Sequence, residues 1–407
     1  MTPSPRRRFP ALPLATSAVL LAASPPSAAA LDSLAPFAGR PVVAVLLQGN
    51  ETTRENVVRR EIQTAVGEPL RPEVVEQDVL RLDNLSIFAQ VAVEAEPVGE
   101  GVRLVYRLKE MPAWIPWVGF SYTEQDGFSG GPKLSALNLK GQAISLSARA
   151  YFGGAKQYSA NLSWPWIKGN HVSFEFAGAR LSRTDTLNEF KETSYEFTPG
   201  AGRYLGRNGR LEAKFSLFRM GSDVDGKTLD PDNQDVLPRL GASVGWDTRD
   251  SWRFPRKGWL NELELWYTSG DGDFVSVNLD LRRWLPVGER QRFLLSSLIS
   301  LQSGTVGVDT PQYLLYRLGG ANSIRGYSID DLGRRLFGKN QLLGTVEYSA
   351  NVLRLQRWDF WKFALRMGLD FAVFADAGIA WSDSSELALD RARGGLGAGL
   401  RLLVPGS

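Results

Sequence analysis

The sequence predicts a mainly β protein, in which one small β-α-α-β-β domain precedes a transmembrane antiparallel β-barrel. Three observations predict the barrel. From Trp114 onward, strand-length runs alternate apolar and polar residues, and no stretch long enough to form a helix has a helical period. Aromatic residues cluster at the ends of these runs, as in "SWPWI" and "ELELWY". Short connections such as "LKGQ" alternate with long ones, residues 222–236 and 305–338. We count about fourteen strands.

Alternation by itself fits two kinds of β protein. "YSANLSW" places Tyr158, Ala160, Leu162 and Trp164 on one face, with small polar residues on the other. In a soluble sandwich the apolar face would meet a core, whereas in a membrane barrel it would meet lipid. The aromatic clusters and the unequal connections favour the barrel.

The first thirty residues have the layout of a secretory signal peptide. Arg6, Arg7 and Arg8 precede an apolar run at residues 15–23, and three alanines at 28–30 offer a cleavage site. The apolar run is too short to span a bilayer. We therefore predict a signal peptide over residues 1–30, a linker over 31–37, the small domain over 38–111 and the barrel over 112–407.

Charge and composition exclude several classes of function. The chain has 47 Lys+Arg and 44 Asp+Glu, and residues 1–30 hold three arginines and no acid, so the mature chain carries 44 of each (47 − 3 = 44). A nucleic-acid partner is therefore not expected. With no cysteine and one histidine, neither disulfides nor the usual soft-ligand metal sites are expected, and we expect no cofactor.

The first half of the small domain reads as a strand and a helix. "PVVAVLLQGN" is a short β-branched strand that ends at a Gly-Asn turn pair. Thr52 and Glu55 have the spacing of a capping box for a helix. Val58, Ile62 and Val66 would form its apolar face, and the next residue, a glycine, can end it.

The second half of the small domain adds a helix and two strands. Pro72 suits the first turn of a helix whose apolar face includes Val75, Val79 and Leu82. "VAVEA" and "VRLVYRLKE" then alternate as strands.

This order resembles that of a POTRA (polypeptide-transport-associated) domain, and several short segments match it: Gly49-Asn50, "GEPL", "LSIF", "AQVAVEAEP" and "VYRLKEMP". The alternative is a generic α/β module. An edge strand exposes unpaired N–H and C=O groups that an extended polypeptide can pair with. If "AQVAVEA" lies at the sheet edge, Val91 and Val93 would belong to a client-pairing edge.

A glycine-rich segment interrupts the strands. "YRLGGANSIRGYSIDDLG", residues 316–333, lies in the longest connection and has four glycines with Arg325 at its centre. A loop folded back into the barrel lumen would use glycine for close approach and for positive φ. An arginine carried inward would need a carboxylate. The alternative is an exposed arginine on a mobile loop.

Three motifs in the strand region resemble the BamA/TamA family of outer-membrane protein-assembly factors (the bacterial surface antigen family). "IRGY" at 324–327 is similar to the loop motif, "FADAG" at 374–378 to its partner strand, and "GWDTRDSWRFPRKG" at 245–258 to the connection between the eighth and ninth strands. The resemblance implies that Arg325 enters the barrel and pairs with Asp376, that Gly326 allows tight approach, and that Tyr327 packs on the wall. The remaining motif residues that it implies are Phe374, Gly378, Asp247, Arg249 and Asp250.

The same resemblance implies a function without covalent chemistry. It points to assembly, insertion or export of client proteins at the cell outer membrane, with the POTRA domain in the periplasm. The implied partners are the outer-membrane bilayer, unfolded outer-membrane or secreted proteins, and accessory periplasmic or inner-membrane subunits. Two rivals are a passive pore and a barrel-anchored hydrolase. "GFSGG" at 127–131 fits a nucleophile pattern, but it bridges two strands and the chain has His171 as its one histidine.

The family pattern also implies more strands than we count. It has sixteen, with the "FADAG" strand thirteenth and the "GLGAGLRLL" strand fourteenth, and here "VPGS" follows directly. Unpaired strand edges are costly in lipid. We therefore expect that the chain lacks the last two strands of a longer protein, roughly 30–50 residues. A smaller closed barrel of fourteen strands is the alternative.

Overall fold

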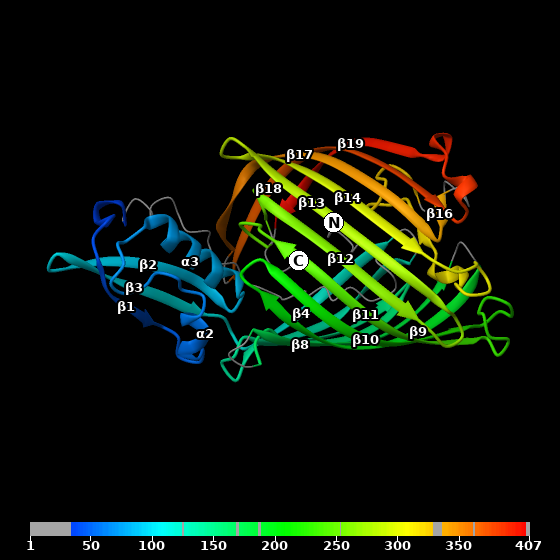
Figure 1. The fold of residues 1–407 in the computed structure, drawn as a ribbon, viewed down its shortest axis with the longest axis horizontal. Coiled ribbons are helices and arrows are strands. Elements are labelled where there is room, and N and C mark those ends of the chain that lie inside the picture. Colours follow the sequence, from blue (N-terminus) through cyan, green and yellow to red (C-terminus); the bar gives the residue numbers. More distant parts are fainter. Residues whose placement is uncertain are drawn as a thin grey trace.

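The computed structural model describes residues 34–403, apart from 124–125, 168–170, 186–188, 253, 329–335 and 361–362. The predicted signal peptide and the final "VPGS" lie outside these residues. The described chain forms a small α/β domain beside a large curved sheet (Figure 1). Within the described ranges, no helix is long and apolar enough to cross a membrane.

The small domain has the predicted β-α-α-β-β order. After a 3-10 turn, η1 (Ala35–Phe37), it comprises β1 (Val42–Gln48), α2 (Glu55–Arg59), α3 (Pro72–Asn84), β2 (Phe88–Val98) and β3 (Gly101–Glu110). The sheet order is β1-β3-β2, with β1 parallel and β2 antiparallel to the central β3. β2 is therefore an edge strand.

Two details of this domain differ from the sequence expectations. Helix α2 has no side-chain cap and ends at Arg59, so the predicted capping box does not form and Val66 is exposed. The backbone N–H groups of Thr52 and Thr53 bind the carboxylate of Glu110 instead, which takes them away from the helix. Leu34 is buried in the core of the domain, so the described end of the predicted linker belongs to the fold.

The core of the domain contains one fully buried carboxylate. Val75, Val79 and Leu82 of α3 pack onto the sheet as predicted. Asp78 lies on the same helix and accepts hydrogen bonds from the backbone N–H of Gln63 (2.7 Å) and from the hydroxyl of Tyr106 (3.0 Å). Burial, together with the charge of Asp78, raises the pKa of Tyr106. This carboxylate stabilises the segment between the two helices, which lacks regular structure.

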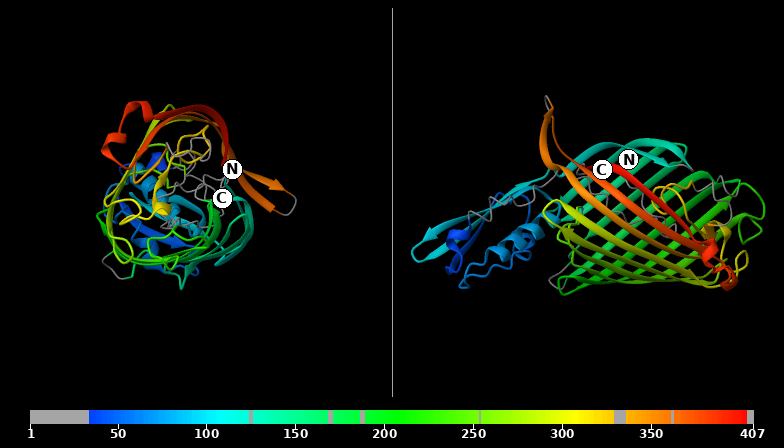
Figure 2. Two further views of the ribbon diagram at one scale, coloured as in Figure 1. Left: turned by 90° about the vertical axis from the view of Figure 1, so that its right-hand side faces the viewer. Right: turned by 90° about the horizontal axis from the view of Figure 1, so that it is seen from above.

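Fourteen antiparallel strands form the large sheet, which matches the sequence count. They are β4 (Trp114–Thr123), β5 (Gly127–Leu139), β6 (Ile144–Gly153), β7 (Lys156–Trp164), β8 (Val172–Asp185), β9 (Phe190–Leu205), β10 (Gly209–Ser222), β11 (Gln234–Asp247), β12 (Gly258–Thr268), β13 (Phe274–Val287), β14 (Gln291–Gln302), β17 (Asn340–Phe360), β18 (Phe363–Trp381) and β19 (Arg393–Leu403). They curl into a barrel (Figure 2). Among the described strands, β4 and β19 are the edges and do not pair with each other.

The barrel has its polar side chains inside and its apolar ones outside. On β13, Val275 is 43% exposed, whereas Ser276, Asn278 and Asp280 are buried on the opposite face. A soluble sandwich would show the reverse, because its apolar face would form the core. This pattern is that of a barrel surrounded by lipid with a polar lumen.

The two ends of the barrel differ in the length of their connections. The three longest connections, residues 223–233, 303–339 and 382–392, all lie at the end opposite the POTRA-like domain (Figure 1). The longest, residues 303–339, joins β14 to β17, and we call it the lumen loop. It contains η2 (Gln312–Leu314), β15 (Tyr316–Arg317) and β16 (Phe337–Gly338). Seen along the barrel, its yellow part lies inside the ring of strands (Figure 2). The β18–β19 connection contains two further turns, η4 (Ser384–Glu386) and η5 (Leu389–Arg391).

Candidate functional site

Arg325 of the lumen loop reaches the wall of the barrel. Its Nε and Nη2 donate to the two carboxylate oxygens of Asp376 on β18 at 2.7 and 2.9 Å. Its backbone N–H donates to the same carboxylate at 3.0 Å. The guanidinium lies over the ring of Phe374, 3.4 Å from the centroid. Because Asp376 is fully buried, this contact supplies the cation that a buried carboxylate needs.

A second carboxylate, which the motifs did not reveal, completes the pairing. Glu347 on β17 accepts from Nη1 of Arg325 and from Nη2 of Arg401 on β19, both at 2.8 Å. Thr345 donates its hydroxyl to Asp376 at 2.9 Å. Thr345 and Asp376 are cross-strand partners in the β17–β18 pair, as are Glu347 and Phe374. The register of β17 against β18, which could not be predicted from the sequence, therefore brings Glu347 and Thr345 to the Arg325–Asp376 contact.

Glycine acts here at positions other than the one we expected. Gly326 has φ +95°, and a Cβ atom built on it would meet nothing within 4 Å, so its role is conformational and not close approach. The close approach is at Gly395 on β19, where a Cβ would lie 2.2 Å from the backbone oxygen of Arg325. Gly378 leaves room for Ile324 beside it.

Tyr327 packs at the base of the same contact. Its side chain is partly buried against an apolar cluster that includes Leu318 and Ile324 of the loop and Leu343 of β17. Its backbone oxygen accepts from the N–H of Gly320 at 2.6 Å, which closes the glycine-rich turn on itself. The loop tip thus packs into a small apolar cluster that it shares with the barrel wall.

The Asp-x-Arg-Asp motif lies elsewhere, at the end of the barrel that carries the small domain. It joins β11 to β12, the eighth and ninth strands of the large sheet. Arg249 binds both carboxylate oxygens of Asp247, at 2.9 and 2.6 Å. Asp250 accepts from the backbone N–H of Arg256 at 2.9 Å. These bonds shape the turn itself, and the motif does not contact Arg325.

The junction between the small domain and the barrel is also hydrogen-bonded. The backbone N–H of Arg54 donates to the oxygen of Gly141, in the turn between β5 and β6, at 3.0 Å. Asn138 of the same region donates its amide to the hydroxyl of Thr53 at 2.8 Å. Burial by itself raises the pKa of Glu110, but hydrogen bonds, chiefly from Thr53, outweigh it and hold this pKa below its usual value.

Val91 and Val93 lie on the edge strand β2, with their side chains buried in the domain core. Pro97 lies in the same strand and in the same alternating set. Proline has no N–H, so in a sheet it occupies edge strands where that group would point away from the ladder. The backbone N–H groups of Val91 and Val93 therefore face the open edge.

The hydrolase pattern does not assemble a catalytic pair. The hydroxyl of Ser129, in "GFSGG", donates to the oxygen of Ala155 and accepts from its N–H. His171 lies in the turn before β8, at the opposite end of the barrel, with its ring against Trp166. In the residues that the structure describes, no group of three or more His, Asp or Glu is placed to hold a metal ion.

Comparison with known families matches both parts of the chain. The model of the Omp85 superfamily domain matches residues 138–406, most of the chain. The chain belongs to the Omp85 superfamily. A second family model, the POTRA-type surface antigen variable number repeat, matches residues 42–111 of this Omp85 protein. These matches confirm the resemblance to BamA/TamA-type factors.

Two relatives of this Omp85 protein carry the name outer membrane protein assembly factor BamA. The protein of Nitratidesulfovibrio vulgaris is 26% identical over 372 residues, which cover 85% of this chain and 44% of the relative. That of Neorickettsia risticii is 24% identical over 327 residues, covering 74% and 43%. The chain thus spans less than half the length of these relatives.

Solved structures share the fold. BamA from Haemophilus ducreyi lacking POTRA domains 1–3 superposes with a TM-score of 0.58 at 16% identity, covering 89% of this chain and 78% of that structure. CdiB from Escherichia coli gives 0.57 at 16% identity, covering 90% and 70%. Family, fold and the apolar outer surface place this Omp85 barrel in the outer membrane, with its POTRA domain in the periplasm.

Proposed function

We propose that this Omp85 protein assembles or exports other proteins at the outer membrane by pairing the β2 edge of its POTRA domain with extended client segments. The observation that carries the proposal is this edge, whose outward N–H groups include those of Val91 and Val93. An unpaired strand edge binds an extended chain through main-chain hydrogen bonds, which are largely independent of client sequence.

The β2 edge begins beside the barrel. Ala89, the second residue of β2, packs against Met111, against Ile115 of β4 and against Leu137 of β5. β4 is in turn an edge of the described barrel sheet. A client strand paired with β2 would therefore lie near a barrel edge, where the same main-chain pairing can continue within the bilayer.

Three other observations support this proposal over its rivals. The relatives bear the name of outer-membrane assembly factors. A passive pore needs an open lumen, whereas part of this lumen holds the loop that carries Arg325. A hydrolase based on "GFSGG" would need a base near Ser129, and His171 lies at the other end of the barrel.

The experiment reconstitutes the chain in lipid vesicles and adds a urea-unfolded outer-membrane protein as the client. Insertion is read as the fraction of client that becomes resistant to added protease. Val93→Pro removes the outward N–H and part of the side-chain packing, whereas the control Val93→Ala keeps the N–H. We expect Val93→Pro to lose most of the client insertion, and Val93→Ala to lose little.

Equal activity of the two variants would remove the β2 edge from the mechanism. Vesicles that conduct ions but insert no client, with the wild-type chain, would instead favour the pore. The fold of each variant is checked by hydrogen exchange of β3, because the core under Val93 includes Tyr106 of that strand.

A further inference from the structure

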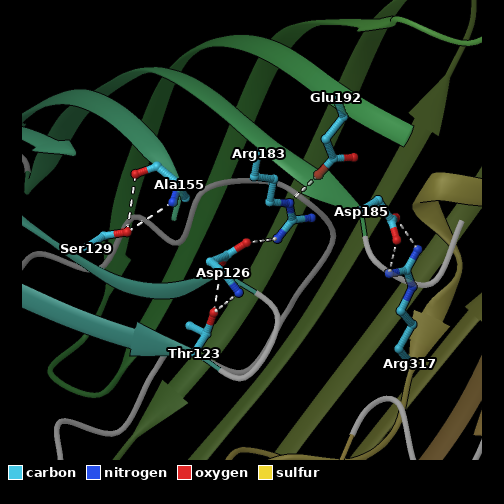
Figure 3. Close-up of polar contacts among 8 residues, drawn as sticks. All are labelled: Thr123, Asp126, Ser129, Ala155, Arg183, Asp185, Glu192 and Arg317. Atoms are coloured by element: carbon cyan, nitrogen blue, oxygen red, sulfur yellow. Dashed lines mark hydrogen bonds and ion pairs between the residues drawn. The ribbon is translucent and has the colours of Figure 1, made fainter. Parts of the chain in front are cut away.

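The lumen loop has a second fixed point, at the outer end of the barrel. Figure 3 shows Arg317 reaching from the loop to Asp185, the last residue of β8. Nη1 and Nη2 of Arg317 donate to the two carboxylate oxygens at 3.0 and 2.6 Å. The two side chains are 3% and 1% exposed, so this is among the most deeply buried ion pairs in the described structure.

This pair reaches across the barrel and does not hold the loop to its own strands. The loop leaves β14, the eleventh strand of the sheet, whereas Asp185 lies on β8, the fifth. Arg325, eight residues after Arg317, binds Asp376 on β18, the thirteenth strand. In a curved sheet of fourteen strands, the fifth and thirteenth lie on well-separated parts of the wall. The segment 317–325 is therefore fixed at both ends, to different parts of the barrel.

The backbone at Arg317 is also held. Tyr316 and Arg317 form β15, which pairs with Phe337 and Gly338 of β16, so the anchor is part of a small two-stranded sheet. The guanidinium also lies 5.8 Å from the centroid of the Phe337 ring. An arginine held in this way loses little conformational freedom when its pair forms.

Strand β8, which carries the acceptor Asp185, is also held by ion pairs to its neighbours. Two residues before Asp185 on β8, Arg183 pairs with Glu192 of β9 and lies 3.8 Å from Asp126 in the turn between β4 and β5 (Figure 3). These contacts link the acceptor strand to its neighbour and to the first hairpin of the barrel. The strand that carries Asp185 is thus tied to two neighbouring parts of the wall.

The loop next to the anchor covers apolar wall positions that a water-filled lumen would not favour. Tyr313, Leu314 and Tyr316 of the loop pack against inward-facing side chains of four strands, namely Phe190, Phe218, Met220, Leu237 and Phe274. Tyr313 also donates its hydroxyl to Asp235 on β11 at 2.6 Å. These apolar contacts at the outer end are those expected of a loop that stays packed against the wall.

We propose that the Arg317–Asp185 pair is a second anchor, which holds residues 313–325 of the lumen loop across the outer end of the barrel and so restricts the flow of ions through the lumen. This goes beyond the proposed function, since it concerns ion permeation in the absence of any client. The anchor also ties the outer end of the loop to the wall opposite Asp376, so that the two contacts together span the lumen.

The test measures ion conductance of the purified chain in planar bilayers without client. Arg317→Ala removes both guanidinium hydrogen bonds to Asp185 and frees the loop, so we expect the fraction of time spent in open events to rise at least about tenfold. Arg219→Ala is the matched control, because Arg219 is an exposed arginine on β10 near the same end of the barrel. Heat-dependent electrophoretic mobility checks that each barrel is folded.

Two further variants make the result decisive. Arg317→Ala with Asp185→Ala removes both charges of the pair, so it lacks the anchor and leaves no carboxylate buried at position 185. It should conduct like Arg317→Ala. The chain has no cysteine, so Arg317→Cys with Asp185→Cys provides two unique thiols. Joining them with a short bifunctional thiol reagent should return conductance to the wild-type level. A folded variant without the anchor that conducts like wild type, or a link that changes nothing, would overturn the proposal.

Discussion

Arg325→Ala should be the most destabilising single change at the loop contact. It removes the guanidinium hydrogen bonds to Asp376 and to Glu347. Asp376, which is fully buried, then keeps Thr345 and one backbone N–H but no cation. Leaving one member of a buried pair uncompensated costs about 3–5 kcal/mol. Glu347 is less affected, because it retains Arg401.

The structure also ranks the partner substitutions. Asp376→Asn removes the charge, but Arg325 keeps Glu347 at 2.8 Å, so we expect a smaller cost of about 1.5–3 kcal/mol. The double variant Arg325→Ala with Asp376→Asn has no unpaired charge at this position. It should recover part of the loss, with a coupling free energy of about 0.5–3 kcal/mol.

The assay is unfolding of the purified barrel by urea in detergent, followed by heat-dependent electrophoretic mobility. Arg219→Ala, an exposed arginine on β10, controls for the loss of any arginine. Strictly additive effects of the two single changes would refute a direct contact. The reasoning would also fail if Asp376→Asn cost as much as Arg325→Ala, because that would assign no role to Glu347.

Two further predictions concern the loop seat and the domain junction. Gly395→Ala should displace the loop tip and lower barrel stability, because its Cβ would meet the backbone oxygen of Arg325, whereas Gly399→Ala, with open space around it, should change little; urea unfolding compares the two. The pKa of Glu110 is held below its ordinary value of 4.5, so its stabilising effect on the junction is present above that pH and is lost as pH falls through the lowered pKa. The protection factor of the Thr53 amide, which is its exchange rate corrected for the intrinsic pH dependence, should therefore fall on acidification. Glu110→Gln should abolish that fall, and a protection factor that does not change with pH in the wild-type chain would exclude Glu110 as the cause.

Local pattern was enough to predict the architecture. The alternation of residues along strands, the position of the turns and the two helices of the small domain are encoded within short stretches, so the strand count and the β-α-α-β-β order follow from them. The capping box predicted for the first helix does not form, and the backbone N–H of Thr52 that it would have used binds a distant carboxylate, Glu110. A local capping signal does not reveal such a competitor.

The site was predicted only in part, because local patterns do not determine which residues of neighbouring strands lie side by side. Arg325 and Asp376 follow from motifs, but Glu347 and Gly395 depend on which residues of β17, β18 and β19 lie side by side. A shift of one residue in register would turn these side chains to the other face of the sheet. Arg317 and Asp185 are 132 residues apart, and neither lies in a motif that points to the other. Such contacts come from the curvature of the sheet around the lumen.

The two fixed points of the lumen loop set an order for the folding of the barrel itself. Arg325 and Asp376 are 51 residues apart, and Arg317 and Asp185 are 132 apart. Contacts of such long sequence separation form late, because the entropy of loop closure must be overcome before they contribute. The first requires β18 to be in place, and the second requires β8 to face the loop across a curved sheet. The loop therefore reaches its final position only after strands from both halves of the barrel have formed. Its two buried ion pairs form late, and only when the wall has its native curvature.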